Sequence, residues 1–213
     1  MQTVMISCGE ASGDLYAGAL AAEIRRRDPR CRVVGFGGER LREAGAELVG
    51  EYRGLAVTGL TEAVRVLPRS YAIYRRLLAR ARAERPAVFI AVDFPDFNFR
   101  AAAAMHRMRV PVVYYVGPQI WAWRPNRIHA MARFVTKALV IFPFEAGIYE
   151  RAGIPVEFVG HPLVDLVSVS QPREPFLTGL GLGASAPTLA VLPGSRINEL
   201  QHTASVLADA LPM

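Results

Sequence analysis

The chain has 213 residues, of which 52% are hydrophobic and 21% are charged, so it can bury a full hydrophobic core and does not have the composition of a disordered protein. No apolar run approaches the roughly 20 residues that span a bilayer, which leaves only peripheral contact with a membrane. The formal net charge of +6 comes from 24 Arg and a single Lys against 19 acidic residues. This Arg bias fits the base composition of the source as well as it fits a phosphate or anionic lipid ligand.

The two cysteines predict no metal site. Cys8 and Cys31 lie near two consecutive predicted strands and lack the spacing of a CxxC or CxxH motif. The amino terminus shows no basic segment followed by an apolar core. We therefore expect buried free thiols in a cytoplasmic protein, with no metal and no cofactor.

The first predicted elements are a strand over Thr3–Ser7 and a helix over Leu15–Arg27, joined by the loop Gly9-Glu10-Ala11-Ser12-Gly13-Asp14. In α/β folds such a loop brings backbone amides to a ligand. The loop has neither the dinucleotide-binding nor the Walker pattern, and Ser12 or Asp14 serves equally well as a helix cap. Strands at Arg32–Gly35 and near Leu48 then alternate with a short helix at Glu39–Ala44, which predicts right-handed crossovers and a parallel sheet.

The segment Leu60–Arg85 predicts a short helix, a break at Pro68 and a second helix to about Arg82. Its apolar residues are too many for one narrow core stripe, and arginines are interleaved with them. Such a helix either packs as an ordinary amphipathic surface helix or rests on an anionic membrane. The candidate membrane contacts are Val64, Val66, Leu67, Arg69, Tyr71 and Tyr74.

The segment Ala87–Asn98 predicts a buried central strand that ends in polar residues. A continuous apolar run rich in Val and Ile is typical of a parallel strand covered on both faces. Asp93 follows that run, at the edge where ligands bind in open α/β sheets. Pro95 ends the strand, and Asp96 and Asn98 are candidate caps of the next helix. Asp93 itself fits either a ligand crevice or a capped loop.

Two later strand ends carry further candidate ligand residues. A strand over Pro111–Val116 precedes Gly117-Pro118-Gln119-Ile120-Trp121-Ala122-Trp123-Arg124, where aromatic rings beside a guanidinium suit a sugar with a nearby phosphate. Core packing of the two tryptophans is the alternative. A strand over Val156–Val159 precedes His161, which is either an acid, a base or a phosphate ligand, or a structural histidine bonded to a neighbouring carbonyl.

The domain organisation predicted from the pattern is a first domain over residues 1–166, a linker over 167–187 and a second, incomplete α/β domain over 188–213. The last part comprises a strand at Thr188–Leu192, the loop Pro193-Gly194-Ser195-Arg196 and a helix from about Asn198 to Leu211. One strand and one helix cannot form a sheet of their own.

Five motifs in this order resemble the lipid-A-disaccharide synthase family across nearly the whole chain: residues 9–14, 93–98, 117–124, 160–162 and 192–196. The resemblance implies a GT-B glycosyltransferase, built from two Rossmann-like α/β domains that face each other across a cleft, inverting and independent of metal. It implies UDP-2,3-diacylglucosamine as donor and 2,3-diacylglucosamine 1-phosphate as acceptor, joined through a β-1,6 bond with loss of UDP in lipid A (lipopolysaccharide) biosynthesis. Contact with an anionic membrane, on the cytoplasmic face of the inner membrane, becomes the favoured interpretation of the arginine-rich helix.

The resemblance also implies roles for individual residues. Asp93 is the expected general base, Asp96 orients its loop, and Glu10 is the second choice for the base. Ser195 and Arg196 are expected to meet the charge of the departing UDP. The residues expected to bind substrate are Gly9, Ser12, Gly13, Asn98, Gln119, Trp121, Trp123, Arg124 and His161.

Two departures from the family pattern qualify these expectations. Gly117 stands where the family commonly has Ser, and most of the domain expected to bind the donor nucleotide is missing, so we expect the 213-residue chain to be inactive alone. A nucleotide-sugar 2-epimerase or another GT-B UDP-sugar enzyme, and a non-catalytic lipid-binding module, are the alternatives. We expect no nucleic-acid partner, and a homo-oligomer is an open possibility.

Overall fold

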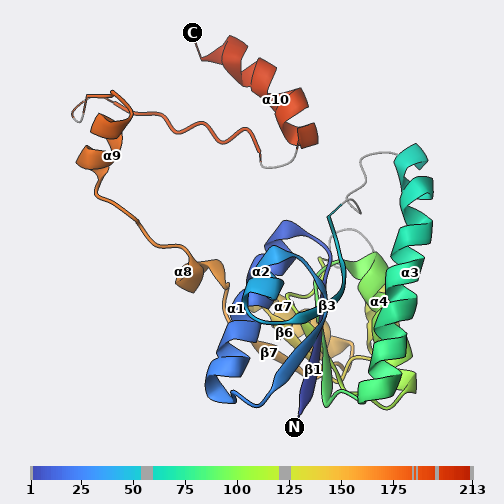
Figure 1. The fold of residues 1–213 in the computed structure, drawn as a ribbon. Helices are drawn as coiled ribbons and strands as arrows, with labels where there is room; N and C mark the ends of the chain where they lie inside the picture. Colours follow the sequence, from blue (N-terminus) through green and yellow to red (C-terminus); the bar gives the residue numbers. More distant parts are fainter. Residues whose placement is uncertain are drawn as a thin grey trace. The chain divides into compact units, whose positions relative to one another are not determined.

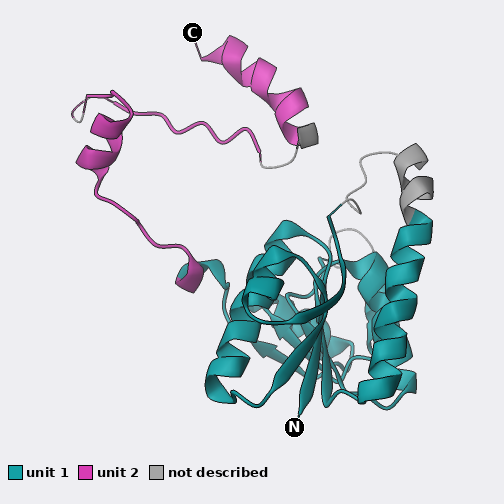
Figure 2. Ribbon diagram, viewed as in Figure 1, with its two compact units in different colours: residues 1–164 teal, residues 165–213 magenta. Residues whose placement is uncertain are grey.

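The structure is a computed structural model that describes residues 2–53, 60–119, 126–183, 185, 187–194 and 197–211. The chain forms two compact units, residues 1–164 and residues 165–213 (Figures 1 and 2). The first unit contains the sheet and most of the helices, and it carries the candidate site.

The first unit is built on a seven-stranded parallel sheet with the order β3-β2-β1-β4-β5-β6-β7. Its strands are β1 (Thr3–Cys8), β2 (Arg32–Gly37), β3 (Glu47–Glu51), β4 (Val88–Val92), β5 (Val112–Tyr115), β6 (Lys137–Val140) and β7 (Val156–Phe158). The helices are α1 (Ala11–Arg27), α2 (Glu39–Glu43), α3 (Leu60–Glu84), α4 (Pro95–Arg107), α6 (Arg127–Met131), α7 (Pro143–Arg151) and, ending just past the boundary, α8 (Leu163–Leu166). The predicted α/β class with a Rossmann-like parallel sheet is confirmed.

The core has two parts because β1 is buried on both faces. On one face Met5 aligns with Val34 of β2 and Phe89 of β4, and this face packs against α3 and α4. On the other face Ile6 packs with residues of α1 and α2, among them Ala17. Figure 1 shows α1 and α2 on one side of the sheet and α3 and α4 on the other.

The strand order changes direction between β1 and β4, the two central neighbours. From β1 the chain continues through α1 to β2, whereas from β4 it continues through α4 on the opposite face to β5. The loops that leave these two strands therefore diverge. In open α/β sheets this divergence opens the crevice that binds ligands.

Helix α3 corrects one prediction, because it runs unbroken from Leu60 to Glu84 with Pro68 inside it. Proline removes one backbone hydrogen bond from a helix interior, which was the reason for expecting a break. The part of α3 that follows Pro68 buries Ile73, Leu77 and Ala81 in the core. Burial of side chains at this four-residue spacing fixes the direction of the helix and offsets the missing bond.

The second unit contains α9 (Arg173–Gly179) and α10 (Ile197–Ala210). Helix α9 lies within the predicted linker and buries Leu177. The strand predicted at Thr188–Leu192 does not form, and these residues have no regular structure. A β-strand needs a neighbouring strand to satisfy its backbone groups, and the described part of this unit supplies none. The domain boundaries themselves stay a prediction.

Asp14 has a structural role that differs from the predicted one. It lies in the first turn of α1, whose N-cap is Glu10, so neither Asp14 nor Ser12 caps this helix. Its buried carboxylate instead accepts hydrogen bonds from the backbone N–H groups of Gly38 (2.7 Å), Arg40 (3.0 Å) and Leu41 (3.2 Å). One side chain thus satisfies the start of α2 and holds the β2–α2 turn against α1.

We predict that Asp14→Asn lowers the free energy of unfolding by about 1–3 kcal/mol, because an amide N–H₂ would face a backbone donor in a buried site. Guanidinium unfolding followed by circular dichroism measures the change. Asp28→Asn, at the exposed end of α1, is the control and should change the stability by less than about 0.5 kcal/mol. Equal effects of the two substitutions would contradict the role given to Asp14.

Candidate functional site

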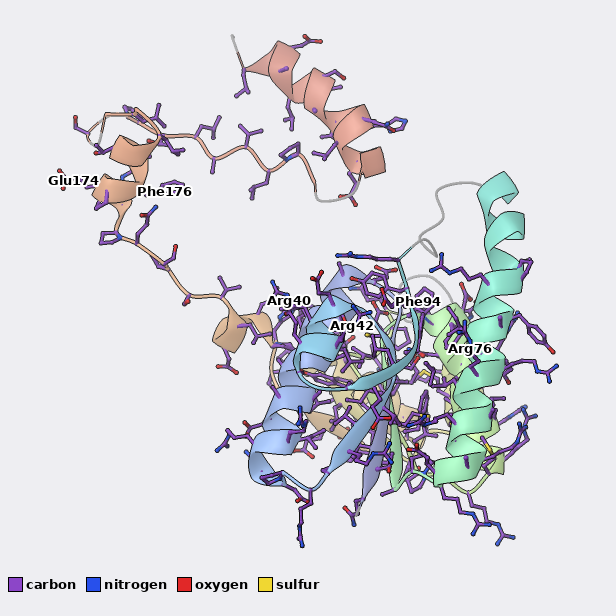
Figure 3. The ribbon with its side chains drawn as sticks, viewed as in Figure 1. Arg40, Arg42, Arg76, Phe94, Glu174 and Phe176 are labelled. Atoms are coloured by element: carbon purple, nitrogen blue, oxygen red, sulfur yellow. The ribbon has the colours of Figure 1, made fainter. Side chains whose placement is uncertain are left out.

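The candidate site lies where β1 and β4 end, at the point where the strand order changes direction. Gly9 and Glu10 follow β1, and Asp93 and Phe94 follow β4. A Cβ atom at Gly9 would lie 2.1 Å from the ring of Phe94, so the two loops touch only because residue 9 is glycine. Figure 3 shows Phe94 at this edge of the sheet.

Asp93 and Phe94 both adopt left-handed backbone conformations, with φ of 44° and 49°. This region costs an L-residue about 1 kcal/mol or more and is concentrated at functional sites. The Asp93 carbonyl accepts hydrogen bonds from the Tyr114 hydroxyl (2.9 Å) and from Asn98 Nδ2 (2.8 Å). The Asp93 N–H donates to the Tyr115 carbonyl at 3.3 Å. These bonds hold the chain in a turn that it would otherwise avoid.

Asn98 joins the ends of β1 and β4. Its side chain is fully buried, and Nδ2 also reaches the carbonyls of Ser7 and Val92, each at 3.2 Å. The Ser7 hydroxyl donates to Asn98 Oδ1 at 2.6 Å. The buried Asn98 side chain therefore fixes the backbone at Asp93 from within the core. Its predicted contact with substrate stays a prediction.

The predicted capping of α4 by Asp96 and Asn98 is wrong. Phe94 occupies the N-cap position, and no side chain caps it. The Asp96 carboxylate is largely exposed and instead accepts a hydrogen bond from Arg127 Nη2 at 2.6 Å. The Arg127 guanidinium also lies 5.4 Å from the centre of the Phe99 ring, so this pair connects α4 with α6.

The negative charge of Asp93 affects the pKa of three tyrosines from three different elements: Tyr16 of α1, Tyr114 of β5 and Tyr149 of α7. Burial raises the pKa of each phenol, and the negative charge of Asp93 raises each pKa further. For Tyr149 the charge of Glu145 raises the pKa more than that of Asp93 does. All three hydroxyls consequently keep their protons at neutral pH, and that of Tyr114 donates to the Asp93 carbonyl.

The turn after β5 packs against one of these hydroxyls. A Cβ atom at Gly117 would lie 2.3 Å from Tyr149 Oη, so a side chain there requires Tyr149 to move. The preceding residue, Val116, also has a left-handed φ of 56°. In this chain the Tyr149 hydroxyl occupies the space that a side chain at position 117 would need. This gives a physical reason why Gly stands where the family commonly has Ser. Gln119, two residues further on, is exposed.

His161, which follows β7, packs among aromatic rings. Its ring centre lies 6.1 Å from that of Tyr16 and 5.7 Å from that of Phe142. Its Nδ1 accepts a hydrogen bond from the Leu163 N–H at 3.2 Å, rather than the bond to a carbonyl that the structural interpretation supposed. Because Nδ1 is an acceptor, the neutral ring carries its proton on Nε2, where it can be donated.

The first turn of α1 also lies at this edge. Gly13 is buried, and a Cβ atom there would come within 3.3 Å of Cys8 Cβ, so it allows α1 to approach β1 closely. Ser12 is exposed, and Glu10 is partly exposed beside it. The free N–H groups of a helix start favour an anionic group at this edge.

The structure describes the side chains of some of the predicted membrane-contact residues. On α3, Leu67 and Tyr71 expose 58% and 61% of their surface, and the Tyr71 ring stacks on Tyr74 at 6.4 Å. Arg69 is also exposed, but it lies on the opposite side of the helix because it is two residues from each of Leu67 and Tyr71, and Figure 3 labels Arg76 on the same helix. Of the other predicted sites, Val64 and Val66 lie on α3 but their side chains are outside what the structure describes, and Trp121, Trp123, Arg124, Ser195 and Arg196 lie outside the described residues altogether.

Two features are absent from the described part of the chain. Within it, no group of three or more His, Cys, Asp or Glu side chains is arranged to hold a metal ion. None of its helices combines the length and the apolar character needed to cross a bilayer.

The sequence model of a known family, described as lipid-A-disaccharide synthetase, matches residues 4–212. The chain belongs to this family. The lipid-A-disaccharide synthase of Koribacter versatilis is 44% identical over 99% of this chain and 55% of its own length, and that of Solibacter usitatus is 45% identical over the same shares. The chain thus spans about half the length of the curated relatives that it matches.

Solved structures confirm the fold class. The S. aureus MnaA–UDP co-structure matches with a TM-score of 0.55 at 12% identity, over 78% of this chain and 45% of that chain. A UDP-GlcNAc 2-epimerase from Neisseria meningitidis bound to UDP-GlcNAc matches with a TM-score of 0.51 at 10% identity, over 73% and 46%. At such low identity these likenesses show the GT-B type of fold and nothing about the ligand of this chain.

Sequence reasoning found Asp93, Gly9 and Glu10 but missed the residues that hold Asp93 in place. Ser7, Tyr114 and Tyr149 lie within a strand or a helix and carry no local motif. Ser7 and Tyr114 gave the same signal, as polar hydroxyls in apolar strands one residue from the strand end.

We predict that Asn98→Ala costs about 2–4 kcal/mol of unfolding free energy, because it leaves the Asp93 and Ser7 carbonyls and the Ser7 hydroxyl short of buried partners. Urea unfolding at neutral pH measures the loss. Asn126→Ala is the matched control, since Asn126 is exposed and its side chain makes no capping bond. A loss below about 1 kcal/mol for Asn98→Ala would show that the turn does not depend on this amide.

Proposed function

We propose that the family-length protein transfers 2,3-diacylglucosamine from UDP-2,3-diacylglucosamine to 2,3-diacylglucosamine 1-phosphate, giving lipid A disaccharide 1-phosphate and UDP. Family membership supports the substrate class. The observation that carries the chemistry is Asp93, a carboxylate held by a constrained turn where the strand order changes direction. Because the chain covers about half of its relatives, the activity is proposed for the longer protein and not for these residues alone.

In the proposed reaction Asp93 is the general base. Its carboxylate takes the proton of the acceptor 6-hydroxyl while that oxygen attacks the anomeric carbon from the face opposite UDP. The bond between the anomeric carbon and the phosphate oxygen breaks, and UDP leaves with the electron pair. The new bond is β-1,6 with inverted configuration, and neither a metal nor a cofactor enters the balance.

The surroundings of Asp93 support this role. Tyr114 and Asn98 hydrogen-bond to the Asp93 carbonyl, so they fix the backbone from which the carboxylate extends. A fixed group loses little orientational freedom when the acceptor binds, which is the main contribution of positioning to catalysis. Glu10 is the second candidate for the base, and Asp96, through its pair with Arg127, orients the loop of α4.

The other site residues are proposed to bind the substrates. At the start of α1, Gly9, Ser12 and Gly13 offer backbone amides that suit the acceptor phosphate. His161, whose ring makes an edge contact with that of Tyr16, offers its Nε2 proton. Asn98 supports this surface from below. The remaining proposed ligands are Gln119, Trp121, Trp123 and Arg124 for the sugars and Ser195 and Arg196 for UDP.

Helix α3 is proposed to rest on the anionic cytoplasmic face of the inner membrane, where a diacylated acceptor resides. Leu67 and Tyr71 expose apolar surface, and Tyr74 supports the Tyr71 ring. Arg75 and Arg82 lie on the same side of the helix as these side chains, since an α-helix has about 3.6 residues per turn. Arg69 and Arg76 lie on the opposite side, where they border one groove of about 520 Å³ together with the edge strand β3. Exposed apolar side chains beside arginines are the chemistry of an interfacial helix. Val64 and Val66 extend the proposed contact in sequence.

The activity is tested by UDP release from the diacylated donor and acceptor in mixed micelles. We expect the family-length protein to release UDP, Asp93→Asn to lower the rate about 100-fold or more, and Asp28→Asn to leave it unchanged. The 213-residue chain should release none. Release that is insensitive to Asp93→Asn would remove Asp93 as the base. Turnover of an unacylated UDP-sugar without acceptor would favour a 2-epimerase instead.

Membrane contact is tested by sedimentation of the 213-residue chain with vesicles of phosphatidylglycerol and phosphatidylcholine. We expect Arg75→Gln with Arg82→Gln to weaken binding at least about threefold per arginine at low salt, since each basic residue near an anionic surface is worth about 1 kcal/mol. Arg69→Gln with Arg76→Gln removes the same charge from the same helix, but on the side opposite Leu67 and Tyr71, where these two arginines border the groove.

Equal weakening by both pairs of substitutions would mean that only net charge matters and that α3 has no preferred face. Leu67→Ser with Tyr71→Ser should weaken binding at high salt as well, because burial of apolar surface is not screened by ions.

A further inference from the structure

The groove between α3 and the edge strand β3, named here the α3–β3 groove, has a volume of about 520 Å³, which is within the range of small-molecule sites. Because β3 ends the sheet, no further strand of the described part covers this groove. Among the described residues that line it are three arginines and one glutamate: Arg42 of α2, Arg69 and Arg76 of α3, and Glu51 of β3. Figure 3 labels Arg42 and Arg76 on their two helices. The charges around the groove are therefore mostly positive.

The two arginines of α3 lie on the face of the helix that packs on β3. Ile73 lies between them, four residues after Arg69 and three before Arg76, and its side chain is fully buried. A Cβ atom at Gly50 of β3 would lie 2.8 Å from Ile73 Cγ1, so the helix and the strand are in close contact there. Residues three and four apart share a helix face. The two arginines thus flank this contact, about 10 Å apart along the helix axis.

Neither of these arginines has a carboxylate partner in the described part of the chain. Arg69 and Arg76 are exposed and make no hydrogen bond or ion pair with any residue that the structure describes. The carboxylates of β3 already have arginine partners: Glu47 pairs with Arg32 and Arg80, and Glu51 pairs with Arg42. Two unpaired positive charges that border one groove repel each other, and an anion bound between them would replace this repulsion with attraction.

We propose that the α3–β3 groove binds the phosphate group of a small soluble ligand, with Arg69 and Arg76 as the donors. A guanidinium group presents paired N–H groups that match two oxygens of a phosphate, and such charge-assisted hydrogen bonds are stronger than neutral ones. The groove lies on the side of α3 opposite Leu67 and Tyr71, away from the proposed membrane contact, which favours a soluble ligand over a lipid headgroup. This site does not depend on the function proposed above.

The site is tested in the 213-residue chain by ¹H–¹⁵N NMR of the arginine Nε–H groups during titration with inorganic pyrophosphate at constant ionic strength. Each signal is assigned by its loss in the corresponding Arg→Gln variant. We expect the signals of Arg69 and Arg76 to shift saturably, because a bound phosphate changes the environment of their N–H groups. The signals of Arg75 and Arg82, on the other side of the helix, should not shift. Equal shifts at all four arginines would show general attraction of anions and refute the site.

The affinity of the groove is measured by following one arginine while another is changed. In Arg69→Gln the Arg76 signal should need at least about tenfold more pyrophosphate to reach its midpoint, since a hydrogen bond between charged groups is lost. Arg75→Gln removes the same charge from the other side of the helix and should leave this midpoint unchanged. Both substituted side chains are exposed, so the melting temperatures should match that of the wild type. An equal effect of the two substitutions would overturn the proposal.

Arg69→Lys separates hydrogen-bond geometry from charge. Lysine keeps the positive charge but lacks the planar pair of donors. We expect the midpoint of the Arg76 signal to rise at least about threefold in this variant, between the values of the wild type and of Arg69→Gln. An unchanged midpoint would refute Arg69 as a donor that binds two phosphate oxygens.

Vesicles of phosphatidylglycerol and phosphatidylcholine distinguish a soluble phosphate from a lipid headgroup. If the ligand is soluble, the chain with Arg69→Gln and Arg76→Gln should sediment with these vesicles as the wild type does. Weaker sedimentation of this variant than of Arg75→Gln with Arg82→Gln, together with no saturable shift by pyrophosphate, would refute the soluble ligand and assign the groove to a lipid headgroup.

Discussion

The left-handed turn at Asp93 and Phe94 is the constraint on which the site depends. Two consecutive L-residues in this conformation are unfavourable in isolation, and the turn persists because the rest of the unit over-determines it. Asn98 and Tyr114 bind the Asp93 carbonyl, and the Phe94 ring fills the space above Gly9. The interactions that stabilise the turn also fix the backbone that carries the candidate base. Stability and candidate function therefore depend on the same hydrogen bonds.

Buried polar side chains are concentrated at this edge of the sheet. Among the described residues, Asp14, Asn98 and Glu145 are buried, and each binds backbone groups that follow the carboxyl end of a strand. Buried Ser7 donates to Asn98, and the fifth buried polar residue, Thr3, lies at the start of β1. The opposite edge relies on exposed pairs such as Arg32–Glu47. Buried hydrogen bonds are strong and directional, whereas exposed ion pairs contribute little. The unit is therefore most rigidly specified where a ligand is expected to bind.

The sequence predicted the sheet well because burial on both faces leaves a local signal in the central strands β1, β2 and β4. It predicted the position of Asp93 because strand ends are local too, and parallel strands bring their carboxyl ends to one edge. It could not predict that Tyr114 binds the Asp93 carbonyl or that Ser7 binds Asn98, since the latter two residues are 91 residues apart and meet only through the strand order. The break at Pro68 and the strand at 188–192 failed for the same reason: tertiary partners, or their absence, decide such segments.

The electrostatic setting of Asp93 is asymmetric. On the protein side lie Tyr16, Tyr114 and Tyr149, which come from three elements, and burial together with the negative charge of Asp93 raises the pKa of each of them. On the crevice side Asp93 remains partly exposed, so water screens much of its interaction with any ligand. Donors already in place need no reorganisation when the acceptor displaces that water, and their effect then grows as the local dielectric falls. The Tyr114 hydroxyl is such a donor, since its bond to the Asp93 carbonyl holds the turn in place before any ligand binds.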